Sequence, residues 1–230
     1  MPTIREFVGS NEILFEDGRI AEVDVVICCT GYSRGFDLIP ELQPAPKSPL
    51  GWVENQNSDG CSIPRLYQNI FPPTRGDSIA YLNNFTLPRG FFHIVDLAAM
   101  AVTQTWKNNP PLPSEEVMNE AIDAHHQWMT SLVKKETVMS DLAKDAWMKW
   151  AQEAAGTGVD EKLGYGLEGW KFWASDWKFC NLLMGGIESP LVDRVIGGKR
   201  KKWDGVRQAI ADQNEEVEER ARSASVLKKE

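Results

Sequence analysis

A run of five apolar residues at positions 25–29 limits the folds open to this chain more than any other segment. The run is rich in β-branched side chains and contains no charged residue, which is the pattern of a strand covered on both faces of a parallel sheet. Residues 78–82 predict a second buried strand, and a polar loop then leads into a helix over residues 91–106. The order of strand, loop and helix predicts an α/β fold.

The first 78 residues also predict a hairpin and an irregular segment. Residues 12–15 and 20–23 flank the pair Asp17-Gly18, which is typical of hairpin turns. Residues 40–78 hold most of the prolines and little periodicity. We therefore expect irregular structure there, with a short strand near residues 66–67.

The second half of the chain predicts helices. Ser114 follows a proline and precedes two glutamates, so it is a candidate N-cap. Six of the nine tryptophans fall between residues 128 and 177, and we expect the helices of that segment to bury large rings. Further helices are expected at about 138–155, 169–184 and 203–220.

The composition excludes several classes of protein. With 230 residues, 42% of them hydrophobic, the chain can bury a sizeable core, and disorder throughout is excluded. A net charge of −8 argues against a general nucleic-acid-binding or anionic-membrane surface, so small molecules or proteins are the expected partners. Four cysteines without CxxC spacing favour a reducing, cytoplasmic setting. No stretch approaches the ~18–20 apolar residues of a membrane span, and peripheral membrane association stays open.

Three short motifs have a structural explanation that we prefer to a functional one. Residues 164–169 match the GxGxxG spacing of a phosphate-binding loop, but no buried strand precedes them, so a glycine-rich connection between helices is favoured. The basic run at 199–202 has acidic neighbours and predicts a solvated loop. His125 and His126 have no cysteine or acidic partner at metal-ligand spacing, so no metal site is predicted.

The ends of the two predicted strands are where a ligand is expected. In open parallel sheets, ligands lie outside the carboxyl ends of the strands, here residues 29–33 and 83–90. The helix after the second end presents free N–H groups that favour an anionic or carbonyl oxygen, and His93 at its start is a candidate to lie near such a ligand. A plain connection between strand and helix explains the same pattern equally well. No residue is assigned a catalytic role.

Several segments, in order along the chain, resemble flavin-containing monooxygenases. Residues 15–32 resemble the family's FEDG and DVVI(A/C)TGY segments, and residues 66–73 resemble its LY and FPP segments. Residues 79–98 resemble its strand, flavin loop and helix. Residues 147–159 resemble its helix ending in IGV, and residues 202–210 resemble its GPGKW motif.

The resemblance implies a fold, two cofactors and a site. The family is built on two dinucleotide-binding domains, so this chain would hold a partial FAD/NAD(P)-binding, Rossmann-like sheet followed by a helical carboxyl-terminal region, with FAD and NADPH as cofactors. Thr86 stands where the family has glutamine, so backbone contacts of the flavin loop are the ones expected to survive. The cofactor-binding residues implied are Thr30, Gly31, Tyr32, Asn83, Asn84, Phe85, Thr86, Leu87, Pro88 and Gly90.

By the same resemblance, the chain divides into four parts. They are the end of the NADPH-binding domain, the carboxyl-terminal part of the FAD-binding domain, a helical region and a frayed tail, at residues 1–30, 31–110, 111–220 and 221–230.

Three functions follow from the resemblance. The first is oxygenation of soft nucleophiles such as amines and sulfides through a flavin hydroperoxide, with NADPH as reductant. The second is a Baeyer–Villiger oxygenation of ketones. The third is a non-catalytic remnant or binding module, because both GxGxxG fingerprints of the family lie upstream of the TGY segment and are missing here. In that case we expect a truncated, inactive chain that associates with itself or with a full-length homologue.

Overall fold

A computed structural model of the chain describes residues 3–9, 11–26, 48–82, 84–87, 90–108, 110–196 and 203–227. The chain divides into two compact units, residues 1–35 and 36–230. Each unit is described by itself.

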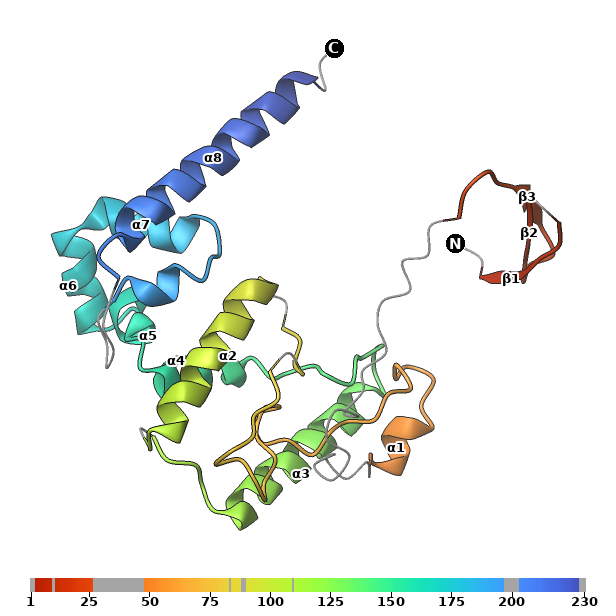
Figure 1. Ribbon diagram of the computed structural model, residues 1–230, viewed down its shortest axis with the longest axis horizontal. Helices are drawn as coiled ribbons and strands as arrows, with labels where there is room; N and C mark the ends of the chain where they lie inside the picture. Colours follow the sequence, from red (N-terminus) through yellow and green to blue (C-terminus); the bar gives the residue numbers. More distant parts are fainter. Residues whose placement is uncertain are drawn as a thin grey trace. The chain divides into compact units, whose positions relative to one another are not determined.

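The first unit holds a three-stranded antiparallel sheet in the order β1 (Ile4–Phe7), β2 (Glu12–Phe15) and β3 (Ile20–Glu22) (Figure 1). The predicted hairpin is confirmed, with Ile13 opposite Ala21. Gly18 adopts a φ of +81°, a left-handed conformation that glycine reaches at little cost, and its N–H donates to the Phe15 carbonyl at 3.0 Å. The turn residues therefore fix this hairpin locally.

The parallel sheet predicted from the sequence does not appear in the described residues. Val25 and Val26 lie outside any strand and are exposed, and residues 27–29 of that predicted strand lie outside the described residues. Residues 78–82 are not a strand either, so that prediction is wrong. Their backbone makes turn bonds to the Arg75 carbonyl and one lateral bond, from the Tyr81 N–H to the Ile70 carbonyl at 2.8 Å. A strand needs neighbouring strands to satisfy its backbone, and no described strand runs beside this segment.

The described part of the second unit is helical. Among the described residues, the first helix is the short α1 (Leu50–Val53). A 3₁₀ turn, η2 (Val192–Arg194), lies near the carboxyl end. The other helices are α2 (Phe91–Trp106), α3 (Glu115–Leu132), α4 (Ala146–Ala155), α5 (Val159–Leu163), α6 (Leu167–Ser175), α7 (Trp177–Gly185) and α8 (Val206–Leu227) (Figure 1).

The helix predictions hold in part. The predicted bounds of α2 are confirmed, and Ser114 caps α3 by accepting a hydrogen bond from the Val117 N–H. Helix α4 begins eight residues later than expected, because residues 138–142 instead form a turn flanked by isolated bridges to Ser58 and Thr86. The helix expected at 169–184 is two helices, since Asp176 ends α6 and its side chain accepts from the Phe179 N–H to start α7. Helix α8 continues to Leu227, within the segment expected to fray.

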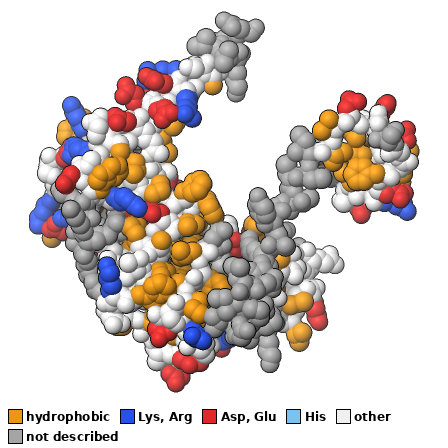
Figure 2. Space-filling model, viewed as in Figure 1, with side chains coloured by type: hydrophobic (Ala, Val, Ile, Leu, Met, Phe, Trp, Pro, Cys, Tyr) orange, Lys and Arg blue, Asp and Glu red, His pale blue; other side chains and the backbone are white. Residues whose placement is uncertain are grey.

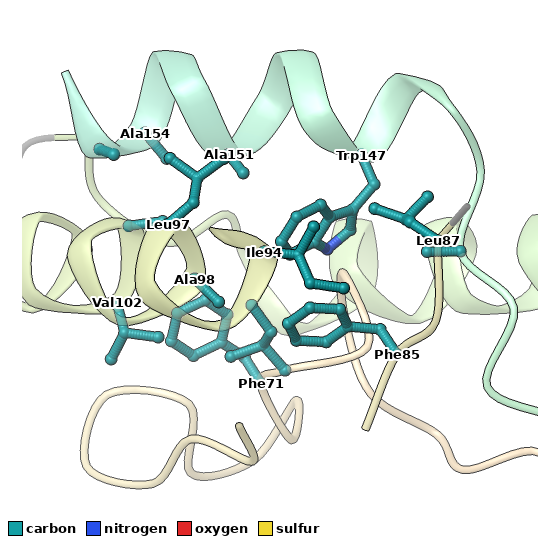
Figure 3. Close-up of a cluster of buried hydrophobic side chains, with 14 residues drawn as sticks. Phe71, Phe85, Leu87, Ile94, Leu97, Ala98, Val102, Trp147, Ala151 and Ala154 are labelled. Carbon is teal, nitrogen blue, oxygen red and sulfur yellow. The ribbon is translucent and has the colours of Figure 1, made fainter. Parts of the chain in front are cut away.

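The largest core lies between α2 and α4 (Figure 3). Small residues on both helices, among them Ala98 and Ala151, let the two backbones approach closely. The Trp147 ring points from α4 toward Ile94 of α2 and lies 4.4 Å, centroid to centroid, from the Phe85 ring. Its indole N–H donates to the Gln68 carbonyl at 2.9 Å, so this buried polar group is satisfied.

Two smaller clusters complete the interior of the second unit. One lies around α1 and α3, with Trp52 and Met129 fully buried, and the other joins α7 to α8. The expectation that the tryptophan-rich segment buries its rings is only partly right: Trp147 is buried, whereas Trp170, Trp173 and Trp177 are exposed. Figure 2 shows hydrophobic side chains gathered on the visible face of the larger unit. Of the described helices, none is both long enough and apolar enough to cross a membrane.

Candidate functional site

Half of the predicted cofactor-binding residues can be placed. Thr30, Gly31, Tyr32, Asn83 and Pro88 lie outside the described residues. The other five are Asn84, Phe85, Thr86, Leu87 and Gly90, and they approach or begin the N-terminus of α2.

Most of the described side chains in the loop before α2 pack in the core or bond to neighbouring residues. Phe85 and Leu87 are buried in the α2–α4 cluster, so neither side chain is free to contact a cofactor. Thr86 is held by residues 141–143: its N–H donates to the Asp141 carbonyl at 2.7 Å, and its hydroxyl donates to the Asp141 carboxylate. Asn84 is the exception, because its Nδ2 is buried and has no hydrogen-bond partner among the described residues. Among the described residues of this loop, it is the one side chain with a buried donor left over.

Gly90 is the N-cap residue of α2, and it gives this helix end little hydrogen bonding from side chains. No side chain caps the helix in the usual way, and the Gly90 N–H donates to Glu188 Oε2 at a long 3.4 Å. Its φ of −58° is open to any residue, and an added Cβ would meet nothing closer than 3.8 Å. The glycine is therefore not required by the fold itself. The rings of Phe91 and Phe92, in the first turn, are 50% and 78% exposed.

A buried histidine lies directly behind this helix end. His93 Nδ1 lies 3.0 Å from Glu188 Oε1, and His93 Nε2 lies 2.7 Å from Asp193 Oδ2. Burial, the largest influence, lowers the pKa of His93, but the hydrogen bonds and charges of Asp193 and then Glu188 outweigh it, so the pKa is raised above its ordinary value of 6.5. His93 is thus a bridge between two carboxylates.

The second carboxylate of this bridge belongs to a wider network. Asp193 is fully buried, and its other oxygen accepts a hydrogen bond from Gln152 Nε2 at 2.7 Å. The side-chain oxygen Oε1 of Gln152 in turn accepts from the Thr157 hydroxyl. One residue along, Arg194 makes a two-pronged ion pair with Asp96 at 2.6 and 2.8 Å. These bonds fasten the start of α2 to η2 and to α4.

Sequence reasoning placed His93 near a ligand but missed its partners. Glu188 and Asp193 lie 95 and 100 residues further along the chain. No spacing rule connects positions so far apart. A weak signal was present, since a histidine on the buried face of a helix needs a polar partner.

The glycine motif at 164–169 serves helix packing, in agreement with the structural explanation. Gly164 ends α5, Gly166 is the N-cap residue of α6, and Gly169 lies inside α6. A Cβ at Gly169 would overlap the carbonyl oxygen of Gly164, so the close approach of these two backbone segments requires a glycine at position 169. The described residues hold no group of three or more potential metal ligands.

The N-terminus of α2 fits one part of a flavin better than another. The helix end has only a long bond from Gly90 to Glu188. Together with the unpartnered amide of Asn84 and two exposed aromatic rings, it suits the carbonyl edge of a flat heterocycle. The glycine-rich segment at 164–169 connects α5 to α6, whereas a loop that binds the pyrophosphate of a dinucleotide follows a strand.

Comparisons with known proteins identify the family. Residues 1–229 match the family model described as flavin-binding monooxygenase-like. Monooxygenase aurF of Gibberella zeae is 37% identical over 215 residues, which is 93% of this chain and 41% of that protein. Flavin-containing monooxygenase 2 of Homo sapiens is 27% identical over 220 residues, 94% of this chain and 36% of that protein.

A plant relative extends the comparison. Flavin-containing monooxygenase FMO GS-OX5 of Arabidopsis thaliana is 24% identical over 155 residues, 66% of this chain and 31% of that protein. The chain therefore spans less than half the length of these relatives. Because the family model covers nearly all of it, the chain belongs to the flavin-binding monooxygenase-like family.

Proposed function

We propose that this chain supplies the part of an FAD- and NADPH-dependent monooxygenase that faces the flavin ring, in an enzyme that oxygenates soft nucleophiles such as amines and sulfides. Family membership supports the reaction class. The observation that carries the placement is the N-terminus of α2, where the Gly90 N–H has only a long bond to Glu188.

The residues at this helix end would bind and orient the ring. When bound, FAD supplies the redox and oxygen chemistry, while the protein binds, orients and excludes water. The N-terminal N–H groups and dipole of α2 would favour negative charge on an oxygen held at this helix end. Asn84 Nδ2 would donate a further hydrogen bond, and Phe91 and Phe92 would shield the ring from water.

Glu188 has a defined role in this proposal. Its carboxylate accepts from the Gly90 N–H at 3.4 Å while its other oxygen lies 3.0 Å from His93. A flavin carbonyl at the helix end would compete for the same N–H. If the carbonyl displaced Glu188 from the Gly90 N–H, the Glu188 carboxylate would keep its hydrogen bond to His93.

The test compares two glycines that both precede a helix. Gly90 and Gly166 are the N-cap residues of α2 and α6, both have negative φ, and an added Cβ would meet nothing within 3.8 Å at the first or 4 Å at the second. Each is replaced by valine in this chain joined to the amino-terminal part of a family member, and the ratio of FAD to protein is measured after gel filtration.

We expect Gly90→Val to lower the FAD content and Gly166→Val to leave it unchanged, since only the first side chain would crowd the ring. NADPH-dependent oxygen consumption with a sulfide substrate should fall in parallel. Equal FAD content in the two variants would refute the placement at α2.

A non-catalytic binding module is the second candidate. The observation that favours it is that the glycine motif at residues 164–169 lies between α5 and α6, whereas a pyrophosphate-binding loop follows a strand. FAD retained by the joined protein, but no oxygen consumption with any amine or sulfide, would favour this candidate over the enzyme.

A further inference from the structure

A pocket beside α3 has the features of a ligand site. It has a volume of about 280 Å³ and lies between α3, the turn at residues 66–69 and residues 143–147. Leu66, Ile122 and Trp147 give it mainly apolar walls. Ligand pockets usually run from about 300 to 1,000 Å³, and this one lies just below that range, so its occupant must be small.

His125 offers this pocket an unused hydrogen-bonding atom. Its Nε2 is buried and has no partner among the described residues. Burial first, and then the charges of Lys144 and His126, lower the pKa of His125 to about 4, so the ring is neutral at pH 7. A buried polar atom without a partner costs stability unless a ligand or water satisfies it.

Lys144 brings a positive charge to the same pocket. Its ammonium group lies 5.4 Å from the centroid of the Trp128 ring, and that ring lies 5.5 Å from the His125 ring. Among the described residues, no ion pair involves Lys144. The charge is held by an aromatic face beside the histidine, without a carboxylate to neutralise it.

Another part of the pocket wall has a strained backbone. Gln68 and Asn69 have φ values of +53° and +56°, and such left-handed backbone costs energy in residues with a side chain. A hydrogen bond from the Trp147 indole to the Gln68 carbonyl, at 2.9 Å, helps to hold the turn in place. Strain of this kind concentrates at ligand sites, and here it sets two side-chain amides along the pocket.

We propose that this pocket binds a small carboxylate with a flat apolar body, with the carboxylate between Lys144 and His125. The apolar part lies against Trp147, Leu66 and Ile122. The ammonium group supplies the opposite charge, and the His125 Nε2–H donates a hydrogen bond to one carboxylate oxygen. The assignment does not depend on the flavin site.

The first test uses benzoate and its uncharged analogue benzamide. Binding to the full chain is measured by isothermal titration calorimetry at pH 6, where the carboxylate is ionised. We expect benzoate to bind at least about tenfold more tightly than benzamide, since only benzoate makes a charge-assisted contact. Equal affinities, or no benzoate binding, would overturn the proposal.

Two lysine variants separate the pocket from general charge. Lys144→Met removes the ammonium group but keeps an apolar stem on Trp128 and should weaken benzoate binding about tenfold or more. Lys149→Met is the matched control, since Lys149 is exposed, lies outside the pocket and pairs only loosely with Glu153 at 4.0 Å. Equal effects of the two substitutions would contradict the site, and far-UV circular dichroism checks that both variants fold.

The pH dependence supplies a readout in the unmodified chain. A bound carboxylate favours the protonated form of His125, so benzoate should bind more tightly at pH 5 than at pH 7. The other charged or titratable groups acting on this ring are Lys144 and His126, and the facing residues Gln68 and Asn69 are uncharged. His125→Gln should abolish the pH dependence. A pH dependence that persists unchanged in that variant would remove His125 from the site.

Discussion

Replacing His93 by alanine should destabilise the second unit strongly and in a pH-dependent way. The substitution removes the hydrogen-bonded contacts of His93 with Glu188 and Asp193, at 3.0 and 2.7 Å. Asp193 would remain fully buried with one remaining partner, Gln152. Breaking a buried ion pair by removing one member costs about 3–5 kcal/mol, mainly because the other charge is left uncompensated. We expect His93→Ala to lower the free energy of unfolding by that amount at pH 6.

The sign of the pH dependence follows from the raised pKa of His93. A group whose pKa is higher in the folded than in the unfolded state stabilises the fold below its unfolded pKa, here about 6.5. That contribution is lost as the pH rises through the folded pKa. The free energy of unfolding of the unmodified chain should therefore fall as the pH rises above 6.5. In His93→Ala, this contribution to the pH dependence should be absent.

Urea unfolding at pH 6 and pH 8, followed by tryptophan fluorescence, measures both effects, because Trp147 is buried in the α2–α4 core. Asp193→Asn serves as the second arm of a double-mutant cycle. With no stranded charge at that position, His93→Ala should cost clearly less in the Asp193→Asn background. A cost below about 1 kcal/mol for His93→Ala, or the same pH slope in both proteins, would refute the buried bridge.

Three other substitutions test the fold. Gly169→Ala would push a methyl group into the Gly164 carbonyl, so urea unfolding should show a loss of about 1–3 kcal/mol. Phe85→Ala removes the ring that packs on Trp147 at 4.4 Å, and thermal unfolding should show a loss of about 3–5 kcal/mol. Ser114→Ala removes the cap of α3 and should cost about 1 kcal/mol by chemical denaturation, whereas Ser114→Asp should retain most of the stability.

The flavin loop shows how far sequence reasoning could locate the site. The residues before α2 were identified from the order of strand, loop and helix and from the family resemblance. The structure describes five of the ten predicted residues and gives them unequal parts: Phe85 and Leu87 pack in the core, and Asn84 keeps an unpartnered amide. Whether a loop side chain points inward or outward depends on the helices that pack on it, which a linear pattern does not contain.

Local chemistry explains the predictions that the structure confirms. Asp17 and Gly18 specify the hairpin, Ser114 specifies the start of α3, and the apolar spacing of residues 91–106 specifies α2. Each depends on bonds between residues a few positions apart, or on one face of one helix. The sequence contains all of that information.

Tertiary structure alone decided the rest. The apolar segment at 78–82 is a strand only if other strands lie beside it, and no described strand does. Glu188 and Asp193 are hydrogen-bonded to His93, which lies almost a hundred residues away in the sequence. Trp147 and Trp173 are the same residue type in neighbouring helices, yet one is buried and the other exposed. Burial and long-range hydrogen bonding depend on which segments pack against each other. The sequence of one segment does not specify which other segment will cover it, so only the folded chain determines them.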